Sequence, residues 1–376
     1  MNGDERTREA IALGESPVGN FLYRPGQLLV ATDALESAEG VIREYHGETT
    51  SVEDDLGLAI VAIPEEFDLP AIVEEMRRRL EQPVVHLNHV FQAAMIHDDT
   101  LPQLPALPRP TRTVPPRPID GGGRGVRVAV LDTGVKLDHP YLADRVRSRG
   151  RQDDDALDVD PDGALGPFAG HGTFVAGIVV QHAPGATVQV RSDLDVRGTG
   201  DDLALASALL SIDADVVLLP FGGYTSDDRL SPALRRALHG LSADTAIVGA
   251  AGNFASDRPF WPAAASSVLA VGAIDGEGSR ALFSNYGPWV NAWATGVDVI
   301  SSFVTFQGRQ APSTGSMVAF NGYAEWSGTS FAAASVAGEI ARTMQPGTIP
   351  SAATASVLAM GRPFSEGGVV LQWRGR

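Results

Sequence analysis

The sequence predicts an α/β protein with a doubly wound, mostly parallel sheet and helices on both faces, preceded by a small α+β domain. From Val126 onward, short and almost continuously apolar segments alternate with helical ones, which is typical of parallel strands covered on both sides. Proline is dense over residues 101–118, which predicts an extended connector. Before it, the segments follow the order βαββαβ of a ferredoxin-like fold.

These changes divide the chain into four parts. We expect a tail (1–20), an α+β domain (21–97), a linker rich in proline and glycine (98–123) and an α/β domain (124–376). A chain of 376 residues is long enough for one large and one small domain. No internal repeat is visible.

The periodicity of apolar residues gives the expected elements. In the first domain, strands are expected at 27–31, 48–52, 58–63 and 84–91, and helices at 34–45 and 68–80. Asp33 and Glu36 predict a capping box for the first helix, and Asp68 predicts the cap of the second. In the second domain, strands are expected at 126–131, 187–190, 216–219, 246–250 and 268–273, and helices at 172–180, 202–211, 232–241 and 330–344.

Composition excludes several classes of function. The net charge of -17 argues against nucleic acid or an anionic membrane as the main partner. The absence of cysteine excludes disulfides, thiolate catalysis and cysteine-ligated zinc. No apolar run has the length of a signal peptide core or a membrane span, so we expect a soluble, cytoplasmic protein that does not bind membranes.

Ser330 stands at the predicted start of a helix made of small residues. The free N–H groups and the dipole of a helix N-terminus favour developing negative charge, which suits a nucleophile. Ser-Gly-Thr-Ser is also an ordinary helix cap, so this motif alone leaves both interpretations open.

Asp132 and His171 supply the partners that a serine nucleophile needs. Asp132 directly follows a predicted strand, where a carboxylate is held rigidly enough to orient an imidazole. It could also be a turn residue, or belong to the Asp-Thr-Gly motif of an aspartic protease, which requires two such motifs or a dimer. His171 lies between Gly170 and Gly172, at the start of a predicted helix. The order Asp, His, Ser is that of subtilisin.

From about Val126 to Met344 the chain resembles the subtilisin-like serine proteases, or subtilases. The matching stretches, which occur in the family's order, are residues 130–135, 170–173, 250–253, 261–263, 283–287 and 328–330. The resemblance implies a subtilisin-like fold in which Ser330 attacks the scissile carbonyl, His171 transfers the proton and Asp132 fixes the imidazole. It also implies that the Asn253 amide and the Ser330 N–H bind the oxyanion.

The resemblance further implies two walls of a primary specificity pocket. These walls contain Leu219, Phe221, Gly222 and Gly223 on one side, and Ala250, Ala251 and Gly252 on the other. Glycines there would let a substrate backbone pair as an added strand. Pro220 lacks an N–H, and Ala334 and Ser335 replace the Pro-His common in the family, so substrate preference is left open.

The N-terminal domain resembles the family's inhibitory propeptide. Residues 84–95 would form its last strand and the tail that lies in the cleft, with self-cleavage expected within 92–97. A permanent regulatory or partner-binding domain is the alternative interpretation.

No cofactor or required metal is expected. Asp158, Asp160 and Asp162 are spaced like half of a calcium loop, but Ala169 stands where the closing glutamate belongs, which favours a solvated acidic loop. Residues 121–123 are glycines without a following Gly-Lys-Ser/Thr, so a phosphate loop is not predicted.

These inferences predict a serine endopeptidase, made as an autoinhibited and self-processing precursor, that acts on peptides or proteins. Its own N-terminal domain would be the intramolecular inhibitor. One alternative is a catalytically silent subtilase-fold binding protein with this domain permanently in the cleft. Another is an esterase or peptide ligase that uses the same triad.

Overall fold

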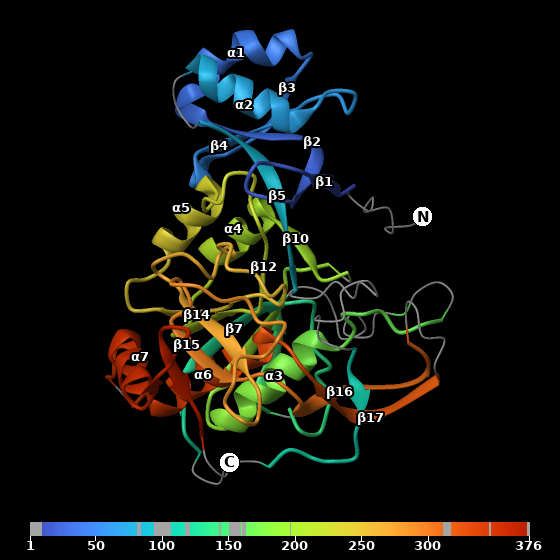
Figure 1. Ribbon diagram of the computed structural model, residues 1–376, viewed down its shortest axis with the longest axis vertical. Coiled ribbons are helices and arrows are strands. Elements are labelled where there is room, and N and C mark those ends of the chain that lie inside the picture. Colours follow the sequence, from blue (N-terminus) through green and yellow to red (C-terminus); the bar gives the residue numbers. More distant parts are fainter. Residues whose placement is uncertain are drawn as a thin grey trace. The chain divides into compact units, whose positions relative to one another are not determined.

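The computed structural model describes most of the chain as two compact units. The described residues are 10–80, 84–93, 107–116, 121–142, 144–149, 159, 163–195, 197–310, 317–345 and 347–373. Unit 1 contains the described part of Met1–Phe91 together with Gly200–Ser211 and Gly223–Leu241. Unit 2 contains Gln92–Thr199, Ile212–Gly222 and Ser242–Arg376, again in their described parts. Both appear in Figure 1.

The N-terminal part of unit 1 has the predicted βαββαβ order. Its elements are β2 (Phe21–Ala31), α1 (Leu35–Glu44), β3 (Glu48–Glu53), β4 (Leu58–Ala62), α2 (Leu69–Leu80) and β5 (Val85–Ala93), with β1 (Ala12–Gly14) paired to β2. The strands lie in the order β5-β2-β4-β3, and neighbouring strands are antiparallel. Leu28, Leu29 and Val30 of β2 are all fully buried. Leu28 and Val30 lie on one face of the strand, in an apolar cluster with residues of α1 and α2.

One of the two predicted caps is wrong. Residues Thr32–Ala34 form a short 3-10 turn, so Asp33 lies inside a helical turn and Ala34 becomes the residue before α1, with no side-chain cap. The second cap is confirmed, because Asp68 Oδ1 accepts a hydrogen bond from the backbone N–H of Ala71 at 3.3 Å.

Two helices from much later in the chain complete unit 1. These are α4 (Asp202–Leu210), which follows β10 (Thr199–Asp201), and α5 (Pro232–Gly240). Arg24 Nε donates to Asp201 Oδ2 at 3.0 Å, and the backbone N–H of His89 donates to Asp202 Oδ2 at 2.9 Å. Tyr224 packs against the apolar core of the N-terminal part. These later segments are therefore joined to the N-terminal part by buried polar bonds and apolar packing.

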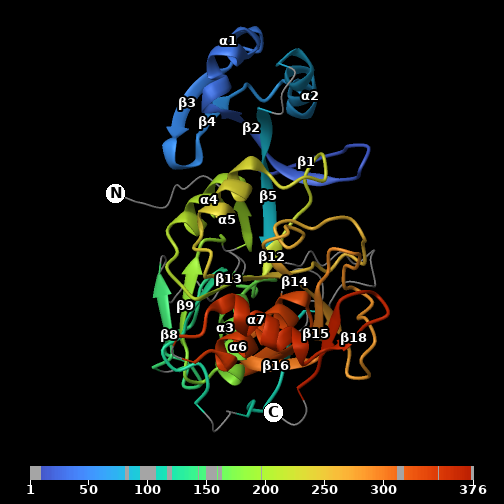
Figure 2. The same ribbon diagram turned by 90° about the vertical axis from the view of Figure 1, so that its left-hand side faces the viewer.

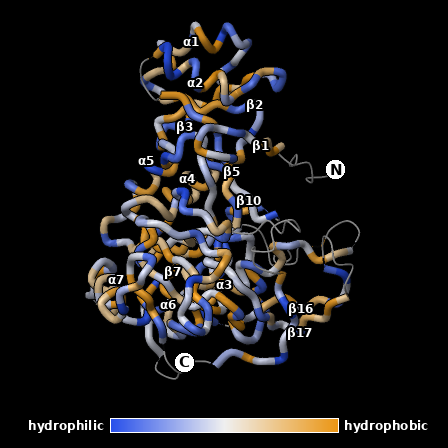
Figure 3. The backbone as a smooth tube through the Cα atoms, in the orientation of Figure 1, coloured by the Kyte–Doolittle hydropathy of each residue, from blue (hydrophilic) through white to orange (hydrophobic). Residues whose placement is uncertain are grey.

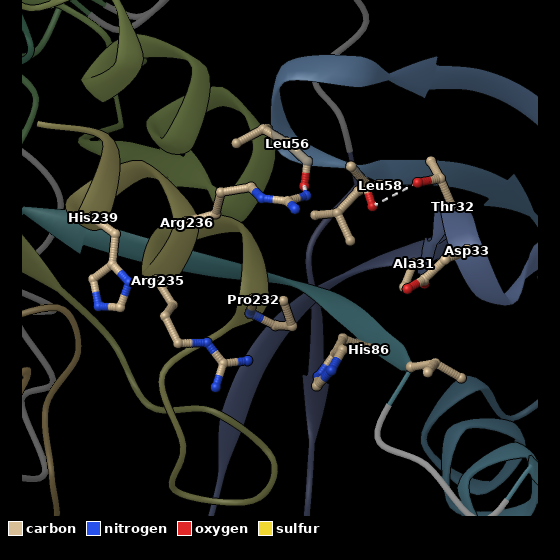
Figure 4. A pocket seen from close by; sticks show the side chains of 12 residues that line it. Ala31, Thr32, Asp33, Leu56, Leu58, His86, Pro232, Arg235, Arg236 and His239 are labelled. Carbon is tan, nitrogen blue, oxygen red and sulfur yellow. Dashed lines mark hydrogen bonds between the residues drawn. The ribbon is translucent and has the colours of Figure 1, made fainter.

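A cavity of about 680 Å³ lies in unit 1 where α5 meets the sheet (Figure 4). Arg236 and Leu56 both line this cavity, and the Arg236 guanidinium donates to the carbonyl of Leu56. On the sheet side, the Thr32 hydroxyl donates to the carbonyl of Gly57 at 3.3 Å. Arg236 thus ties α5 to the turn that precedes β4.

Unit 2 is built on a sheet with nine strands among its described residues. In spatial order they are β18 (Arg362–Pro363), β19 (Val369–Leu371), β15 (Ala292–Thr295), β14 (Leu269–Ile274), β13 (Ala246–Ala250), β11 (Val216–Leu219), β7 (Arg127–Asp132), β9 (Thr187–Ser192) and β8 (Val146–Arg149). Every neighbouring pair is parallel except β18 with β19. The predicted doubly wound, mostly parallel sheet is confirmed.

The strand order reverses beside β7, with β9 on one side and β11 on the other. In open α/β sheets, the crevice at such a reversal opens at the carboxyl ends of the strands. Asp132 is the last residue of β7, and Pro220 directly follows β11. This topology brings both residues to the crevice.

Two buried helices pack on each other and on this sheet. They are α3 (His171–His182) and α6 (Thr329–Thr343), and α7 (Pro350–Ala359) lies beside α6 (Figure 2). Apolar residues run along α3 and α6 (Figure 3), and every residue of α6 up to Ala341 is buried. Both helices begin one residue before their predicted starts.

The described part of the predicted connector contains one short strand, β6 (Arg109–Pro110), which joins a long hairpin. Strands β16 (Val299–Arg309) and β17 (Met317–Trp326) pair with each other, and β17 also pairs with β6. Gln310 Nε2 donates to the Pro108 carbonyl at 3.2 Å, and the Tyr141 hydroxyl donates to the Pro116 carbonyl at 3.1 Å. The rest of the predicted connector lies outside the described residues.

Within the described part of the chain, no helix is both long enough and apolar enough to cross a membrane.

Glu339 is a fully buried carboxylate in α6. Its Oε1 lies 2.9 Å from Nδ1 of His182, and its Oε2 accepts from Arg342 Nε at 2.6 Å. Burial by itself raises the pKa of Glu339, but hydrogen bonds and charge from His182 and Arg342 outweigh it and hold the pKa below its ordinary value. The ionised form therefore stabilises the fold.

We expect Glu339→Gln to lower the free energy of unfolding by about 3 kcal/mol at neutral pH, since the change breaks a buried ion pair. A carboxyl whose pKa is lowered by folding contributes stability above its unfolded pKa, and loses it as the pH falls through the folded value. The difference from wild type should therefore shrink on acidification. Urea unfolding at several pH values measures it, with the exposed Glu277→Gln as control. A pH-independent difference would contradict the expectation.

Candidate active site

Asp132 and His171 form a buried hydrogen-bonded pair. The Nδ1 atom of His171 lies 2.9 Å from both carboxylate oxygens of Asp132, and both side chains are almost wholly enclosed. The N–H and the hydroxyl of Thr133 also donate to Asp132 Oδ1, at 2.7 and 3.2 Å. A carboxylate placed this way accepts the Nδ1 proton, so the tautomer it favours leaves Nε2 as a base.

Glycines let the first turn of α3 approach the end of β7. Gly170, which precedes His171, has φ of 72°, in the left-handed region that glycine adopts without strain. A Cβ on Gly172 would collide with the carbonyl of Gly134 and lie 3.1 Å from Cβ of Asp132. The Gly-His-Gly sequence is therefore required by the close contact that makes the pair.

Ser330 lies in the first turn of α6 and is also buried. Its hydroxyl donates to the Pro220 carbonyl at 3.0 Å. The His171 ring packs against the rings of Trp326 and Phe331, at centroid distances of 5.6 and 5.7 Å, and these residues flank Ser330 in the sequence. Phe331 directly follows Ser330, so these ring contacts bring the imidazole to the first turn of α6.

Asn253 is held in one orientation by Thr329. Its Oδ1 accepts from the backbone N–H of Thr329 at 2.9 Å and from the Thr329 hydroxyl at 2.8 Å. That hydroxyl accepts from the N–H of Gly252 at 3.0 Å. With Oδ1 committed to Thr329, Nδ2 is directed the other way, and a Cβ on Gly328 would lie 3.6 Å from it. The amide nitrogen therefore lies beside the first turn of α6.

The predicted pocket walls lie at the ends of adjacent strands. β11 ends at Leu219, β12 (Phe221–Gly222) follows it, and β13 ends at Ala250. Leu219 is paired with Gly249, which brings the two wall segments side by side. The remaining wall residues are Ala251 and Gly252, which follow β13, and Gly223, which falls in unit 1.

The sequence did not identify two residues of this site. Thr329 belongs to the Gly-Thr-Ser stretch at 328–330, but nothing in the sequence indicates that its hydroxyl bonds to Asn253. Pro220 was noted only for its missing N–H, whereas its carbonyl is the acceptor for Ser330.

The possible calcium ligands Asp158, Asp160 and Asp162 lie outside the described residues. Among the residues that are described, no group of three or more His, Cys, Asp or Glu side chains is placed to hold a metal ion.

Comparisons with known proteins identify the family of this chain. The sequence profile of the Subtilase family matches residues 123–359, so the chain belongs to the subtilase family of serine proteases. The thermophilic serine proteinase of Bacillus sp. strain AK1 is 32% identical over 332 residues, which are 84% of this chain and 77% of that protein. The intracellular serine protease of Paenibacillus polymyxa is 32% identical over 240 residues, which are 59% of this chain and 68% of that protein.

A solved structure supports the fold. Fervidolysin from Fervidobacterium pennivorans, a keratinolytic enzyme related to subtilisin, matches with a TM-score of 0.62 at 18% sequence identity. The match covers 93% of this chain but 60% of fervidolysin, so fervidolysin has regions without a counterpart here.

If Thr329 orients Asn253, Thr329→Val should lower kcat and change KM little, because the asparagine would act only on the charge that develops during reaction. We expect the loss to be smaller than that for Asn253→Leu. For the latter we borrow the decrease of about 10²–10³ that subtilisin itself gives for its oxyanion asparagine.

Steady-state kinetics on a peptide amide measures these losses. Thr329→Ser keeps a hydroxyl and should keep most of the activity. Equal activity of Thr329→Val and wild type would rule out the positioning role.

Proposed function

We propose that this chain is a serine endopeptidase that uses Asp132, His171 and Ser330. The observation that carries the proposal is the buried pair of Asp132 and His171, in contact with the aromatic residues that flank Ser330. A serine beside an imidazole that a carboxylate orients has the arrangement of a nucleophile, a base and an orienting acid.

Acylation would begin with attack of Ser330 Oγ on the scissile carbonyl carbon, while Nε2 of His171 takes the hydroxyl proton. The negative charge that forms on the carbonyl oxygen would accept hydrogen bonds from the Asn253 amide and the Ser330 N–H. His171 would then give the proton to the leaving nitrogen as the C–N bond breaks. Water would attack the acyl-serine in the same way and release the acid.

We further propose that the N-terminal region inhibits the enzyme. Gln92 and Ala93 pair antiparallel with Gly222 and Phe221, and the Ala93 N–H donates to the Gly198 carbonyl at 2.7 Å. Residues of the chain itself therefore occupy the β12 edge, where a substrate strand would bind. A peptide fixed there would compete with substrate.

The same register supports self-cleavage close behind Ala93. Ala93 is paired with Phe221, the residue that follows Pro220, and the Pro220 carbonyl is bound to the Ser330 hydroxyl. A substrate strand that binds in this register would therefore reach Ser330 one residue beyond the position of Ala93. Beyond Ala93, the predicted cleavage range of 92–97 lies outside the described residues.

The N-terminal part would stay bound after cleavage. The Arg24–Asp201 pair, the His89–Asp202 pair and the contact from Arg236 to Leu56 all join residues before the cut to residues after it. Inhibition would then last until these contacts separate or the N-terminal part is degraded.

One observation favours the silent binding protein as a second candidate. Ser330 is almost wholly buried and its hydroxyl is bound to Pro220, while residues 92–93 occupy the β12 edge. If this arrangement were permanent, the same contacts would describe a regulatory protein.

Location in the cell is a separate proposal. One relative is named an intracellular serine protease, and by analogy we propose that this chain also acts in the cytoplasm. Fractionation of the producing cells tests it, and recovery of the protein in the medium would refute it.

The first test is the intact mass of the purified wild type beside Ser330→Ala. If Ser330 is the nucleophile of self-processing, wild type should lose its residues up to the neighbourhood of Ala93, while the variant stays whole. Labelling of Ser330 by a fluorophosphonate probe provides a second measurement that does not depend on processing. A chain that neither processes nor labels would support the silent candidate.

Arg24→Ala should weaken the hold of the N-terminal part after cleavage. The change leaves Asp201 with an uncompensated buried charge, and we expect the cleaved piece to bind about a hundredfold more weakly. Peptidase activity should then appear sooner during incubation of the full chain. Arg43→Ala removes an exposed arginine of α1 and is the matched control. Equal onset of activity in both variants would argue against a role for Arg24 in inhibition.

A further inference from the structure

The two predicted walls of the specificity pocket are bridged by an aromatic ring. A Cβ on Gly222 would lie 2.6 Å from Cδ1 of Phe260, and a Cβ on Gly252 would lie 3.0 Å from the same atom. One edge of the phenyl ring therefore touches both wall glycines. Neither glycine can gain a side chain unless Phe260 moves.

The surroundings of Phe260 hold the ring in this place. It is 1% exposed, and its centroid is 5.8 Å from that of Phe254. The carbonyl oxygen of the next residue, Trp261, would lie 2.7 Å from a Cβ on Gly222. Because the ring is packed on several sides, the space between the walls is filled by the protein itself.

The strand register identifies which substrate side chain would meet this ring. Gln92 lies opposite Gly222, and a strand continued by two residues brings the residue before the cut opposite Pro220. Side chains two positions apart on a strand point to the same face, and directly opposed residues share a face. The side chain before the cut would therefore lie on the face to which a Cβ of Gly222 would point, toward Phe260.

We propose that Phe260 forms the floor of the specificity pocket and restricts the residue before the cut to a small side chain, such as glycine, alanine or serine. The inference rests on the proposed peptidase function and adds its substrate class. The chain's own sequence agrees, because the residue after Ala93 is Ala94.

A larger side chain would have to displace the ring from a packed site. Overfilling a well-packed space is costly, and we expect leucine or phenylalanine before the cut to lower kcat/KM by about 10- to 100-fold relative to alanine. The effect should depend on size, since the contacts that carry it are apolar.

The test uses p-nitroanilides of Phe-Gln-Ala-X, in which the first three residues repeat Phe91, Gln92 and Ala93 and X is glycine, alanine, leucine or phenylalanine. The full-chain enzyme is incubated until it has self-processed and its N-terminal part has separated or been degraded, and kcat/KM is then measured. Wild type should prefer alanine and glycine. Phe260→Ala removes the ring. It should therefore raise kcat/KM for leucine and phenylalanine by about 10- to 100-fold, the factor by which wild type disfavours these residues relative to alanine.

Two further variants control for misfolding of Phe260→Ala. Phe260→Leu keeps an apolar floor with less bulk and should accept leucine better than wild type while still rejecting phenylalanine. Tyr323→Ala removes an aromatic ring that packs on His139 and Tyr141 rather than on the pocket walls, so it should keep the wild-type ranking.

The outcomes separate this inference from the proposed function. Good cleavage after phenylalanine by wild type, or an unchanged ranking in both Phe260 variants, would overturn the role of Phe260 and leave the peptidase intact. No cleavage of any peptide, together with no fluorophosphonate labelling of Ser330, would overturn the peptidase and this inference with it. Labelling without cleavage would overturn the substrate class alone.

Discussion

The hydrogen bond between Asp132 and His171 is the interaction on which the arrangement of unit 2 depends. Both groups are buried, so a carboxylate without its imidazole would lose a partner of both oxygens and keep, among the described bonds, only the two Thr133 donors on Oδ1. The bond requires the end of β7 and the first turn of α3 to be in backbone contact, and Gly172 allows this because it has no side chain. The strand order adds the second requirement, since it reverses beside β7 and opens the sheet at that residue.

Helix α6 brings the remaining groups to the same point. Its small residues, such as Ala332 and Ala334, are fully buried and let the helix lie against several strands at once. Ser330 and Thr329 occupy its first turn, so the position of the hydroxyl and the orientation of the Asn253 amide are set by one rigid element. In the proposed mechanism, donors fixed in this way would act on developing charge without having to reorient.

The sequence predicted the elements that local pattern decides. Strands 216–219 and 246–250 have the predicted bounds, because a continuous apolar run between polar turns is a strong local signal. The hairpin of β16 and β17 was missed, since its strands pair mainly with each other and their pattern is weak. The motifs gave the candidate residues, but the bond from Thr329 to Asn253 and the ring of Phe260 between two glycines depend on contacts between distant parts of the chain. The joining of α4 and α5 to the N-terminal part is equally non-local.

The pairing of β6 with β17 determines how far a new chain end could travel after processing. Arg109 is bonded to Asp298 and Glu325, and Pro108 accepts from Gln310, so the chain is tethered to unit 2 from Pro108 onward. If the chain is cut before Pro108, as we propose, this bonded point would remain with the enzyme. An affinity tag placed before Gln92 would instead leave with the inhibitor, so its loss would report release of the N-terminal part.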